Sequence, residues 1–305
     1  MSLCAKKRSV RTDWKREEVR DLYFSPLIDL IHQGAEITRQ NFNPTKMQTC
    51  QLLSIKTGGC SENCSYCSQS AHNTTEVKPQ KLLELNDVLT KAREAKEMGN
   101  TRFCMGAAWS KVRDSNDFEN ILEMVSKIKA MGLEVCCTLG MLNKEQARKL
   151  KEAGLTAYNH NLDTGPNHYP NIVTTRSYDD RLNTLSNLTE AGINVCCGGI
   201  LGIGESDEDR VDLLHTIATL PKHPESVPIN CLVAIEGTPM QDQKPVEIWE
   251  TIRMVATARI LMPKTKIRLA AGRLNMSDAE QTLCFIAGAN SIFVGEKFLT
   301  TPNRA

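Results

Sequence analysis

The strongest constraint on the fold of this chain is a regular alternation of strand and helix patterns. Short apolar and β-branched runs recur about every thirty residues, and amphipathic helical patterns fill the intervals between them. The expected strands are Thr49–Thr57, Thr101–Gly106, Leu133–Leu139, Thr156–Leu162, Ile193–Gly199, Val227–Val233, Ile267–Ala271 and Ser291–Gly295. The expected helices are Leu85–Met98, Asp117–Met131, Lys144–Ala153, Tyr178–Ala191, Asp207–Leu220, Val246–Met262 and Asp278–Ala287. Such βα units predict a closed (β/α)8 TIM-type barrel of the α/β class, and an open doubly wound sheet is the alternative.

Residues at the ends of these helices support the prediction. Side chains that can cap a first turn precede five helices, at Ser115, Asn143, Ser177, Ser206 and Ser277. Glycines that can end a helix follow five, at Gly99, Gly132, Gly154, Gly192 and Gly288. A further helical pattern near Glu17–Gln40 is expected to pack outside the barrel. We therefore divide the chain into an N-terminal helical extension, residues 1–45, and a barrel, residues 46–305.

Composition narrows the function classes. The 305 residues carry a formal net charge of +1, which argues against nucleic acid or an anionic membrane as a partner. We find no apolar run long enough to span a membrane and no secretory signal, so we expect a cytoplasmic protein. The basic residues near the start are interpreted as a solvated tail rather than a targeting peptide: Lys6, Lys7, Arg8, Arg11, Lys15 and Arg16.

Twelve cysteines are an unusual number for such a chain. A disulfide scaffold fits poorly, since disulfide-dense proteins are mostly small and secreted. Metal ligands and buried small hydrophobic residues are the remaining uses, and we expect both.

Three of these cysteines, Cys60, Cys64 and Cys67, follow the first expected strand within eight residues. Thiolates select iron–sulfur clusters, zinc or copper(I). Tetrahedral zinc usually takes a fourth ligand from a second cysteine pair, and this triplet has no such partner. A cubane cluster on three protein ligands leaves one iron open for chemistry. The alternatives are a structural metal knot or three inert cysteines.

The C-x3-C-x2-C spacing, with the aromatic Tyr66 before the last cysteine, resembles that of the radical S-adenosylmethionine superfamily. The resemblance implies a 4Fe–4S cluster on these cysteines, whose open iron binds the amino and carboxylate groups of S-adenosylmethionine. An electron from the cluster then splits the sulfonium and yields a 5′-deoxyadenosyl radical. It also implies that Tyr66 lies against the adenine.

A second set of cysteines lies on three other expected strands, at Cys104 and in the pairs Cys136-Cys137 and Cys196-Cys197. Because side chains alternate faces along a strand, only one member of each pair can point into a barrel, and periodicity does not say which. Taken singly, each is best explained as a buried core cysteine. Taken together, three strands could hold a second cluster in the lumen.

From Thr12 to Thr301 the sequence closely resembles the biotin synthase family. The matching stretches are Leu52–Gly58, Arg102–Trp109, Tyr158–Thr164, Val227–Asn230 and Ile267–Arg273. The resemblance implies a 2Fe–2S cluster on the first cysteine of each pair together with Cys104 and an arginine; the four ligands are Cys104, Cys136, Cys196 and Arg268. A protonated guanidinium has no free lone pair, so without the resemblance Arg268 would be explained as a salt-bridged barrel residue.

The implied activity is that of a sulfurtransferase that converts dethiobiotin to biotin. The adenosyl radical removes a hydrogen, the carbon radical attacks a bridging sulfide of the second cluster, and a second round closes the ring. No catalytic residue is expected beyond the cluster ligands. The resemblance also implies a homodimer and a small electron donor of the flavodoxin or ferredoxin type.

Polar residues follow the fourth expected strand. Asn159, Asn161 and Asp163 alternate, so they share one face, while His160 points the other way and is expected to be structural. A carboxylate suits a ribose diol, and asparagines suit a urea ring. By the resemblance, Asn161 and Asp163 contact the nucleoside, while Asn159, Asn161 and Asn230 face the ureido group of the substrate.

A glycine-rich segment, Gly198–Glu205, follows the fifth expected strand, but its spacing differs from a dinucleotide-binding fingerprint. Close approach of backbone to a nucleoside explains it better. By the resemblance, Ile200 contacts the adenine, and Ala107 lies near the methionine end of the cofactor.

Three rival functions remain, of which the most distant is a zinc-binding interaction module that a colourless purified protein would support. Another radical enzyme on this scaffold, such as a hydrogenase maturase or an amino-acid mutase, would not require the strand cysteines together with Arg268. A non-catalytic iron–sulfur electron carrier or redox sensor would need neither an open iron nor the polar face that ends at Asp163.

Overall fold

The computed structural model describes residues 10–295 and 297–302 of the chain. The strands are β1 (Gln48–Lys56), β2 (Arg102–Ala107), β3 (Glu134–Thr138), β4 (Ala157–Asn159), β5 (Asn194–Cys196), β6 (Gly199–Leu201), β7 (Ser226–Cys231), β8 (Lys266–Leu269), β9 (Ser291–Val294), β10 (Lys297–Phe298) and β11 (Thr301–Pro302). The helices are α1 (Arg16–Tyr23), α2 (Leu27–Asn41), α3 (Leu85–Glu97), α4 (Asn116–Ala130), α5 (Lys144–Glu152), α6 (Tyr169–Ile172), α7 (Tyr178–Glu190), α8 (Asp207–Ala218), α9 (Ile248–Leu261) and α10 (Asp278–Ala287), with a 3-10 turn at Arg273–Asn275.

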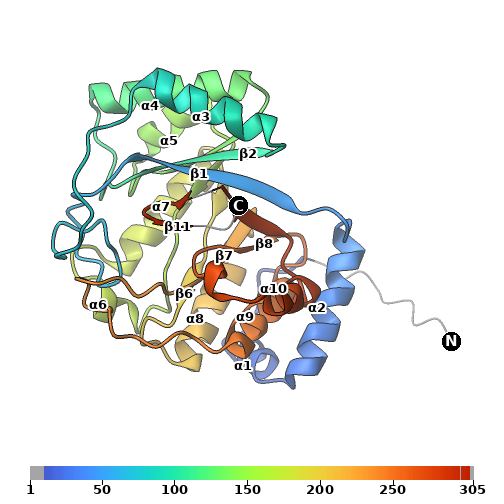
Figure 1. Ribbon diagram of the computed structural model, residues 1–305. Coiled ribbons are helices and arrows are strands. Elements are labelled where there is room, and N and C mark those ends of the chain that lie inside the picture. The colour runs from blue at the N-terminus through green and yellow to red at the C-terminus, as the bar shows by residue number, and fades with distance from the viewer. Residues whose placement is uncertain (1–9, 296, 303–305) are drawn as a thin grey trace.

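The parallel strands close into a barrel. Their order is β5-β4-β3-β2-β1-β9-β8-β7-β6, and Cys196 of β5 also pairs with Ser226 of β7, which joins the two ends of the sheet. The helices surround the strands, as Figure 1 shows. The predicted (β/α)8 TIM-type barrel is therefore confirmed, and the open sheet is excluded.

Local sequence signals account for the helix boundaries. All five predicted capping side chains accept a hydrogen bond from the backbone N–H three residues on; they are Ser115, Asn143, Ser177, Ser206 and Ser277. All five predicted terminal glycines have positive φ, where a side chain would be strained. In the part of the chain that the structure describes, no helix is both long and apolar enough to cross a membrane.

The fourth and fifth strands differ from the prediction. The fourth ends at Asn159 rather than Leu162, and the fifth is split into β5 and β6. The reason is a close approach at Gly198, where a Cβ would lie 1.9 Å from Pro228 O. Asn161 Oδ1 accepts a hydrogen bond from Gly198 N (3.1 Å), so a side chain replaces part of the strand ladder.

The two N-terminal helices pack outside the barrel. Gly34 lets α2 approach α10 so closely that a Cβ would lie 2.1 Å from Ala287 O. Arg16 of α1 pairs with Asp212 (2.5 Å) and Glu208 (2.8 Å) of α8, so the prediction of a solvated basic tail is wrong for this residue. Lys6, Lys7 and Arg8 lie outside the described residues. The division at residues 45 and 46 falls between α2 and β1 and stays a prediction.

Candidate active site in the barrel lumen

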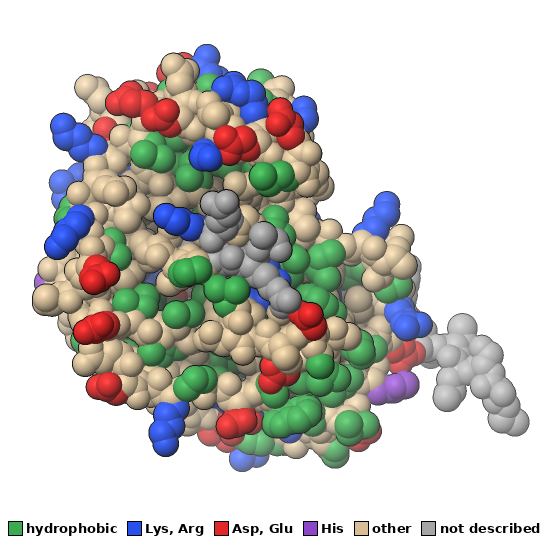
Figure 2. All heavy atoms as spheres, viewed as in Figure 1, with side chains coloured by type: hydrophobic (Ala, Val, Ile, Leu, Met, Phe, Trp, Pro, Cys, Tyr) green, Lys and Arg blue, Asp and Glu red, His purple; other side chains and the backbone are tan. Residues whose placement is uncertain are grey.

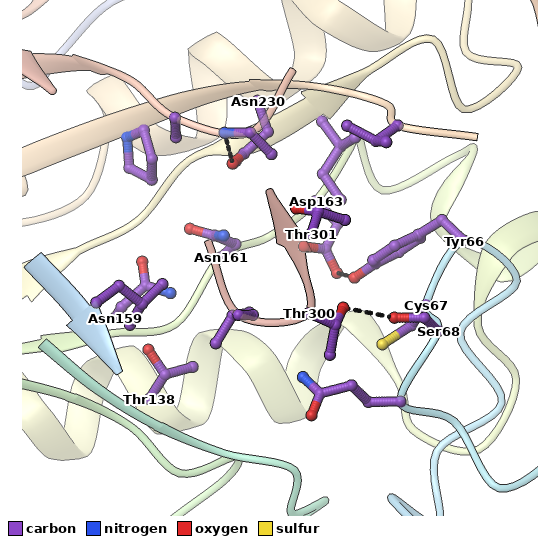
Figure 3. Close-up of a pocket in the computed structure, with 18 of the residues that line it drawn as sticks. Tyr66, Cys67, Ser68, Thr138, Asn159, Asn161, Asp163, Asn230, Thr300 and Thr301 are labelled. Carbon is purple, nitrogen blue, oxygen red and sulfur yellow. Dashed lines mark hydrogen bonds between the residues drawn. The ribbon is translucent and has the colours of Figure 1, made fainter. Parts of the chain in front are cut away.

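One cavity of about 310 Å³ runs from the mouth of the barrel into its lumen. Cys67 and Tyr66 line it near the cysteine loop, and Cys104, Cys136 and Arg268 line it in the lumen. One cysteine of the loop and two of the strand cysteines therefore open onto one space. Figure 3 shows the polar residues of this cavity, with Tyr66 facing Asp163 and Thr300 facing Ser68.

Backbone hydrogen bonds hold the cysteine loop in shape. Cys60 N donates to Gln69 O (2.9 Å), and Ala71 N donates to Cys60 O (2.7 Å). Asn73 Nδ2 donates to the carbonyl oxygens of Cys64 (3.1 Å) and Cys67 (2.8 Å). The loop is thus ordered by contacts that leave its three thiols available.

Burial disfavours the thiolate form of the three loop cysteines more than the nearby cations favour it. Burial raises the pKa of Cys60, Cys64 and Cys67, the last to about 12. The one cationic contact to a loop sulfur that the structure records is from Arg176, whose Nη2 donates to Cys64 Sγ at 3.7 Å. All eleven cysteines in the described ranges are free, so disulfides do not use them. Positively charged iron would supply the missing stabilisation, and the donor set fits an iron–sulfur cluster.

A second layer of thiols lies deeper in the barrel. Cys104, Cys136 and Cys196 are each no more than 4% exposed, while Cys137 and Cys197 pack in the outer core between strands and helices. The structure thus decides which member of each pair points inward. Among the described residues, no three His, Cys, Asp or Glu side chains are arranged around a single metal ion. A cluster is itself wider than one ion, so its ligands need not converge on one point.

Arg268 lies in the same layer and is 1% exposed. Its Nε donates to Ser291 Oγ (2.9 Å), its Nη2 to Gln48 Oε1 (3.1 Å), and its Nη1 to Cys196 Sγ (3.7 Å). Burial lowers the pKa of Arg268, but the neighbouring thiolates raise it further than burial lowers it. The side chain is therefore placed next to the thiols as a cation that donates hydrogen bonds.

The N-terminal end of the barrel is filled by a group of charges that we call the charged floor: Arg102, Glu134, Glu225 and Lys266. Arg102, whose side chain is 1% exposed, pairs with Glu225 at 2.9 Å and with Glu134 at 2.8 Å. Gln48 Nε2 donates to Glu134 Oε2 (3.3 Å) and its Oε1 accepts from Arg268, so the floor is linked to the thiol layer.

Nearer the mouth, Asp163 is the centre of a buried polar cluster. Its φ of +68° turns the chain out of the strand direction and directs the carboxylate toward the loop. Oδ2 accepts from Tyr66 Oη (2.9 Å) and forms an ion pair with Arg181 Nη2. Arg181 Nη1 also donates to Asn161 O (2.6 Å). Both of these side-chain contacts end on Oδ2.

The three predicted amide residues differ in how they are held. Asn230 joins two strands, because its Nδ2 donates to Gly199 O (2.9 Å) and its Oδ1 accepts from Ala271 N (3.2 Å). Asn161 is fixed by Gly198 N, and Asn159 is half-buried in the cavity wall. Ala107 and Ile200 line the same cavity, on β2 and β6.

His160 was predicted to point away from the face of Asn159, Asn161 and Asp163, but it is buried and lines the same cavity as they do, because the chain leaves the strand conformation after Asn159. Burial lowers the pKa of His160 well below its usual value, and the charges of Arg181 and Arg176 lower it further. The ring is therefore neutral at physiological pH.

The sequence matches two family models. Residues 54–217 match the radical SAM superfamily, and residues 228–305 match the biotin and thiamin synthesis associated domain. The chain is 62% identical to the mitochondrial biotin synthase of Arabidopsis thaliana over 96% of its own length and 78% of the relative. It is 59% identical to the biotin synthase of Cytophaga hutchinsonii over 96% and 87% of the two lengths.

The chain belongs to the biotin synthase family, within the radical SAM superfamily. Solved structures agree on the fold. A methylornithine synthase superposes with a TM-score of 0.78 at 19% identity, covering 92% of this chain and 82% of that one. The hydrogenase maturase HydG from Carboxydothermus hydrogenoformans also gives 0.78, at 17% identity and with 92% and 67% covered.

The structure adds residues that the sequence analysis did not select for this biotin synthase family site. Arg181 and Arg176 lie on or just before α7 and reach the cavity wall, although no pattern in the sequence marks a helix arginine as pointing inward. Cys50 on β1 lies in the thiol layer. The sequence could have indicated this position, because Cys50 lies two residues before Leu52 on an expected strand and the two side chains therefore share one face of that strand.

Proposed function

We propose that this protein is a biotin synthase, which inserts sulfur into dethiobiotin with the use of S-adenosylmethionine. The observation that carries the proposal is one cavity that Cys67 of the loop lines at its mouth and Cys104 and Cys136 line in the lumen, with the amide side chains of Asn159, Asn161 and Asn230 also in its wall. Such a cavity can hold a small substrate between two sulfur-rich centres and keep water from it.

Residues present in the chain match both expected clusters. Cys60, Cys64 and Cys67 would hold a 4Fe–4S cluster with one open iron. A 2Fe–2S cluster would take the four lumen ligands predicted above, which are Cys104, Cys136, Cys196 and Arg268. When bound, the first supplies the electron that cleaves S-adenosylmethionine, and the second supplies the sulfide.

The protein's own side chains would orient the two ligands. Asp163 presents Oδ1 to the ribose while Arg181 and Tyr66 fix the carboxylate from the other oxygen. Asn159 and the remaining amide hydrogens of Asn161 and Asn230 would face the ureido group. Ala107 and Ile200 offer apolar wall next to the cofactor, since both line the cavity.

We further propose a homodimer, a cytoplasmic location and an electron donor of the flavodoxin or ferredoxin type. Figure 2 shows apolar side chains gathered over the corner where α2, α9 and α10 meet. Ile28, Trp249 and Ile286 of these helices are 76%, 53% and 48% exposed, which supports a protein contact there. Light scattering of wild type and Ile28→Lys should show a dimer that the charge dissociates; a wild-type monomer would contradict the dimer.

Anaerobic iron and sulfide analysis with Mössbauer spectroscopy tests the function. Wild type should show both a 4Fe–4S and a 2Fe–2S centre, and it should convert dethiobiotin to biotin. Cys136→Ala should lose only the second centre, whereas Cys137→Ala, one residue away in the outer core, should keep both. A single centre that Cys136→Ala leaves unchanged would contradict sulfur insertion. Two centres without turnover of S-adenosylmethionine would favour an electron carrier or redox sensor.

A further inference from the structure

The cysteine loop has an inner and an outer side. Cys67 lines the cavity, whereas Cys60 lies outside the cavity wall and is half-buried between Gly59 and Ser61, which are both exposed. A cluster on the three loop cysteines would therefore meet the cavity beside Cys67 and come nearest to solvent beside Cys60. An electron that reaches such a cluster from another protein has its shortest path on the outer side.

Residues 78–81 lie against this outer side. A Cβ on Gly59 would lie 3.3 Å from the side chain of Pro79, and Thr57 O accepts a hydrogen bond from Gln80 N (2.8 Å). The segment begins and ends with lysine, and both lysines are exposed. Two cations are thus held beside the loop by backbone contacts.

Two more lysines lie on neighbouring segments. Lys56, half-buried at the end of β1, has its Nζ 3.7 Å from the position that a Cβ on Gly59 would take, and this Nζ donates to Ala108 O (3.3 Å). The loop after β2 is therefore held beside β1, and it carries the exposed Lys111. We call the four lysines the cationic edge: Lys56, Lys78, Lys81 and Lys111.

Little negative charge offsets the cationic edge. In the part of the chain that the structure describes, its three exposed lysines form no ion pair. Glu76 is the one carboxylate among residues 71–83, and Glu62 of the loop is buried and lies 3.8 Å from Arg176. Positive charge is therefore concentrated beside the loop, although the whole chain carries a net charge of only +1.

We propose that the cationic edge is the docking surface for a small acidic one-electron carrier, which delivers its electron on the Cys60 side of the loop. The inference rests on the proposed function, because it presumes a cluster on the loop cysteines, and it assigns the electron donor a place on the molecule. In the transfer the carrier is oxidised by one electron and the cluster is reduced by one. No bond between the two proteins is made or broken covalently, and no further reactant is needed.

Charge complementarity favours this partner. Four lysines around one loop fit an acidic protein face, whereas nucleic acid needs a longer basic track, which a net charge of +1 does not favour. Opposite charges raise the rate of encounter by about 10–10³-fold, and the gain falls as salt screens the charges. The docking surface should therefore be evident in the rate at which the cluster is reduced and in how that rate depends on salt.

The test compares two reductants of the loop cluster in the full, anaerobically reconstituted chain without S-adenosylmethionine. One is an acidic flavodoxin in its hydroquinone form, and the other is neutral photoreduced deazaflavin, which needs no docking surface. Freeze-quench electron paramagnetic resonance follows the reduced cluster. Lys78→Glu combined with Lys81→Glu should slow reduction by flavodoxin about tenfold or more at low salt and leave reduction by deazaflavin unchanged. The difference should shrink at about 1 M salt, where the Debye length is about 3 Å.

Lys222→Glu combined with Lys264→Glu is the matched control. It makes the same change in charge on two exposed lysines that line a separate pocket with Glu225, at the N-terminal end of the barrel. It should keep the wild-type rate with both reductants. Lys111→Glu, on another loop of the cationic edge, should slow flavodoxin alone, and it repeats the test should the first double variant bind less iron than wild type.

Three outcomes would overturn the docking surface while the proposed function stands. The first is an equal flavodoxin rate in wild type and in the Lys78→Glu and Lys81→Glu variant at equal iron content. The second is equal slowing in the control, which would show attraction by overall charge alone. The third is a wild-type cluster that deazaflavin reduces and flavodoxin does not. If wild type binds no cluster that deazaflavin can reduce, the proposed function fails together with the inference.

Discussion

Replacing Asp163 by asparagine should destabilise the protein by about 3 kcal/mol, because it leaves the buried Arg181 guanidinium without a negative partner. The side chains of Asp163 and Arg181 are 3% and 5% exposed, so water screens the pair little. Asparagine tolerates the positive φ at this position and keeps an oxygen acceptor. Arg181 also keeps Tyr169 Oη and Asn161 O as acceptors, which places the cost at the low end of the range of about 3–5 kcal/mol for such changes.

Urea and thermal unfolding of the metal-free, reduced protein, followed by circular dichroism, measure this cost. The thermal midpoint should fall by about 6–12 °C, at about 2–4 °C per kcal/mol. The double variant with Arg181→Gln should cost about 2 kcal/mol less than the sum of the single changes, because partners of one ion pair are coupled. Glu190→Gln, which removes one side of the exposed pair with Lys144, is the control and should leave the midpoint unchanged.

A thermal midpoint of Asp163→Asn within about 1 °C of wild type would refute the reasoning, since leaving a buried cation without a carboxylate partner should lower the unfolding free energy by much more than such a shift reflects. Strictly additive costs in the double variant would show that the two side chains do not interact.

Three further predictions concern stability and loop order. Gly34→Ala should lower the thermal midpoint although alanine favours helices by about 1 kcal/mol, because its Cβ would lie 2.1 Å from a backbone oxygen of α10; a higher midpoint would contradict the packing. Gly237→Ala places a Cβ 1.9 Å from Thr74 O, next to the cysteine loop, at a φ of +80°. The amount of iron bound per chain after reconstitution should therefore fall, and proteolysis of residues 58–80 should accelerate. Wild-type values of both would show that the contact is dispensable. Burial raises the pKa of Glu225, but the two cations of the charged floor hold it at about 2. Because the pKa of Glu225 is lower in the folded protein, the ionised carboxylate stabilises the fold above the unfolded pKa of about 4.3, and this stabilisation is lost as pH falls. The difference in unfolding free energy between wild type and Glu225→Gln, about 3 kcal/mol near pH 6, should therefore shrink between about pH 5 and pH 2. A difference that stays constant over this range would contradict the argument.

Much of the fold could be predicted because its signals are local. Helix caps, terminal glycines and strand periodicity each depend on a few neighbouring residues, and the capping predictions held at every position tested. The fourth and fifth strands failed where a distant residue intervenes. Pro228 O, on another strand, lies too close to Gly198 to leave room for a side chain, and no residue near Gly198 in the sequence indicates this contact.

At the site, residue type and spacing alone carry the prediction for the loop cysteines, whose role as cluster ligands stays a prediction. Alternation predicts that one cysteine of each pair points inward, but which one depends on the register between strands. The register of β3 against β2 places Cys136 beside Cys104, and that of β5 against β4 and β7 places Cys196 beside Asn159 and Ser226. Cys50 escaped notice because each strand was considered separately. Arg181 was missed because a helix arginine is usually exposed, and its burial depends on Asp163 in another element.

The charged floor also determines the order in which the lumen can fill and empty. Arg102 and its partners close the N-terminal end of the barrel in the described part of the chain, so exchange with solvent runs through the mouth, past Tyr66 and Cys67. The thiols of Cys104 and Cys136 lie deepest, and Asn159 lies one lumen position nearer the mouth than Ala157, the residue paired with Cys136, and level with Cys196. A molecule held beside Asn159 blocks the path from the mouth to the deeper thiols, and it cannot leave while a second molecule occupies the mouth. Whatever the inner layer binds must therefore enter before a molecule occupies the mouth, and it can be exchanged only while the path from the mouth is vacant.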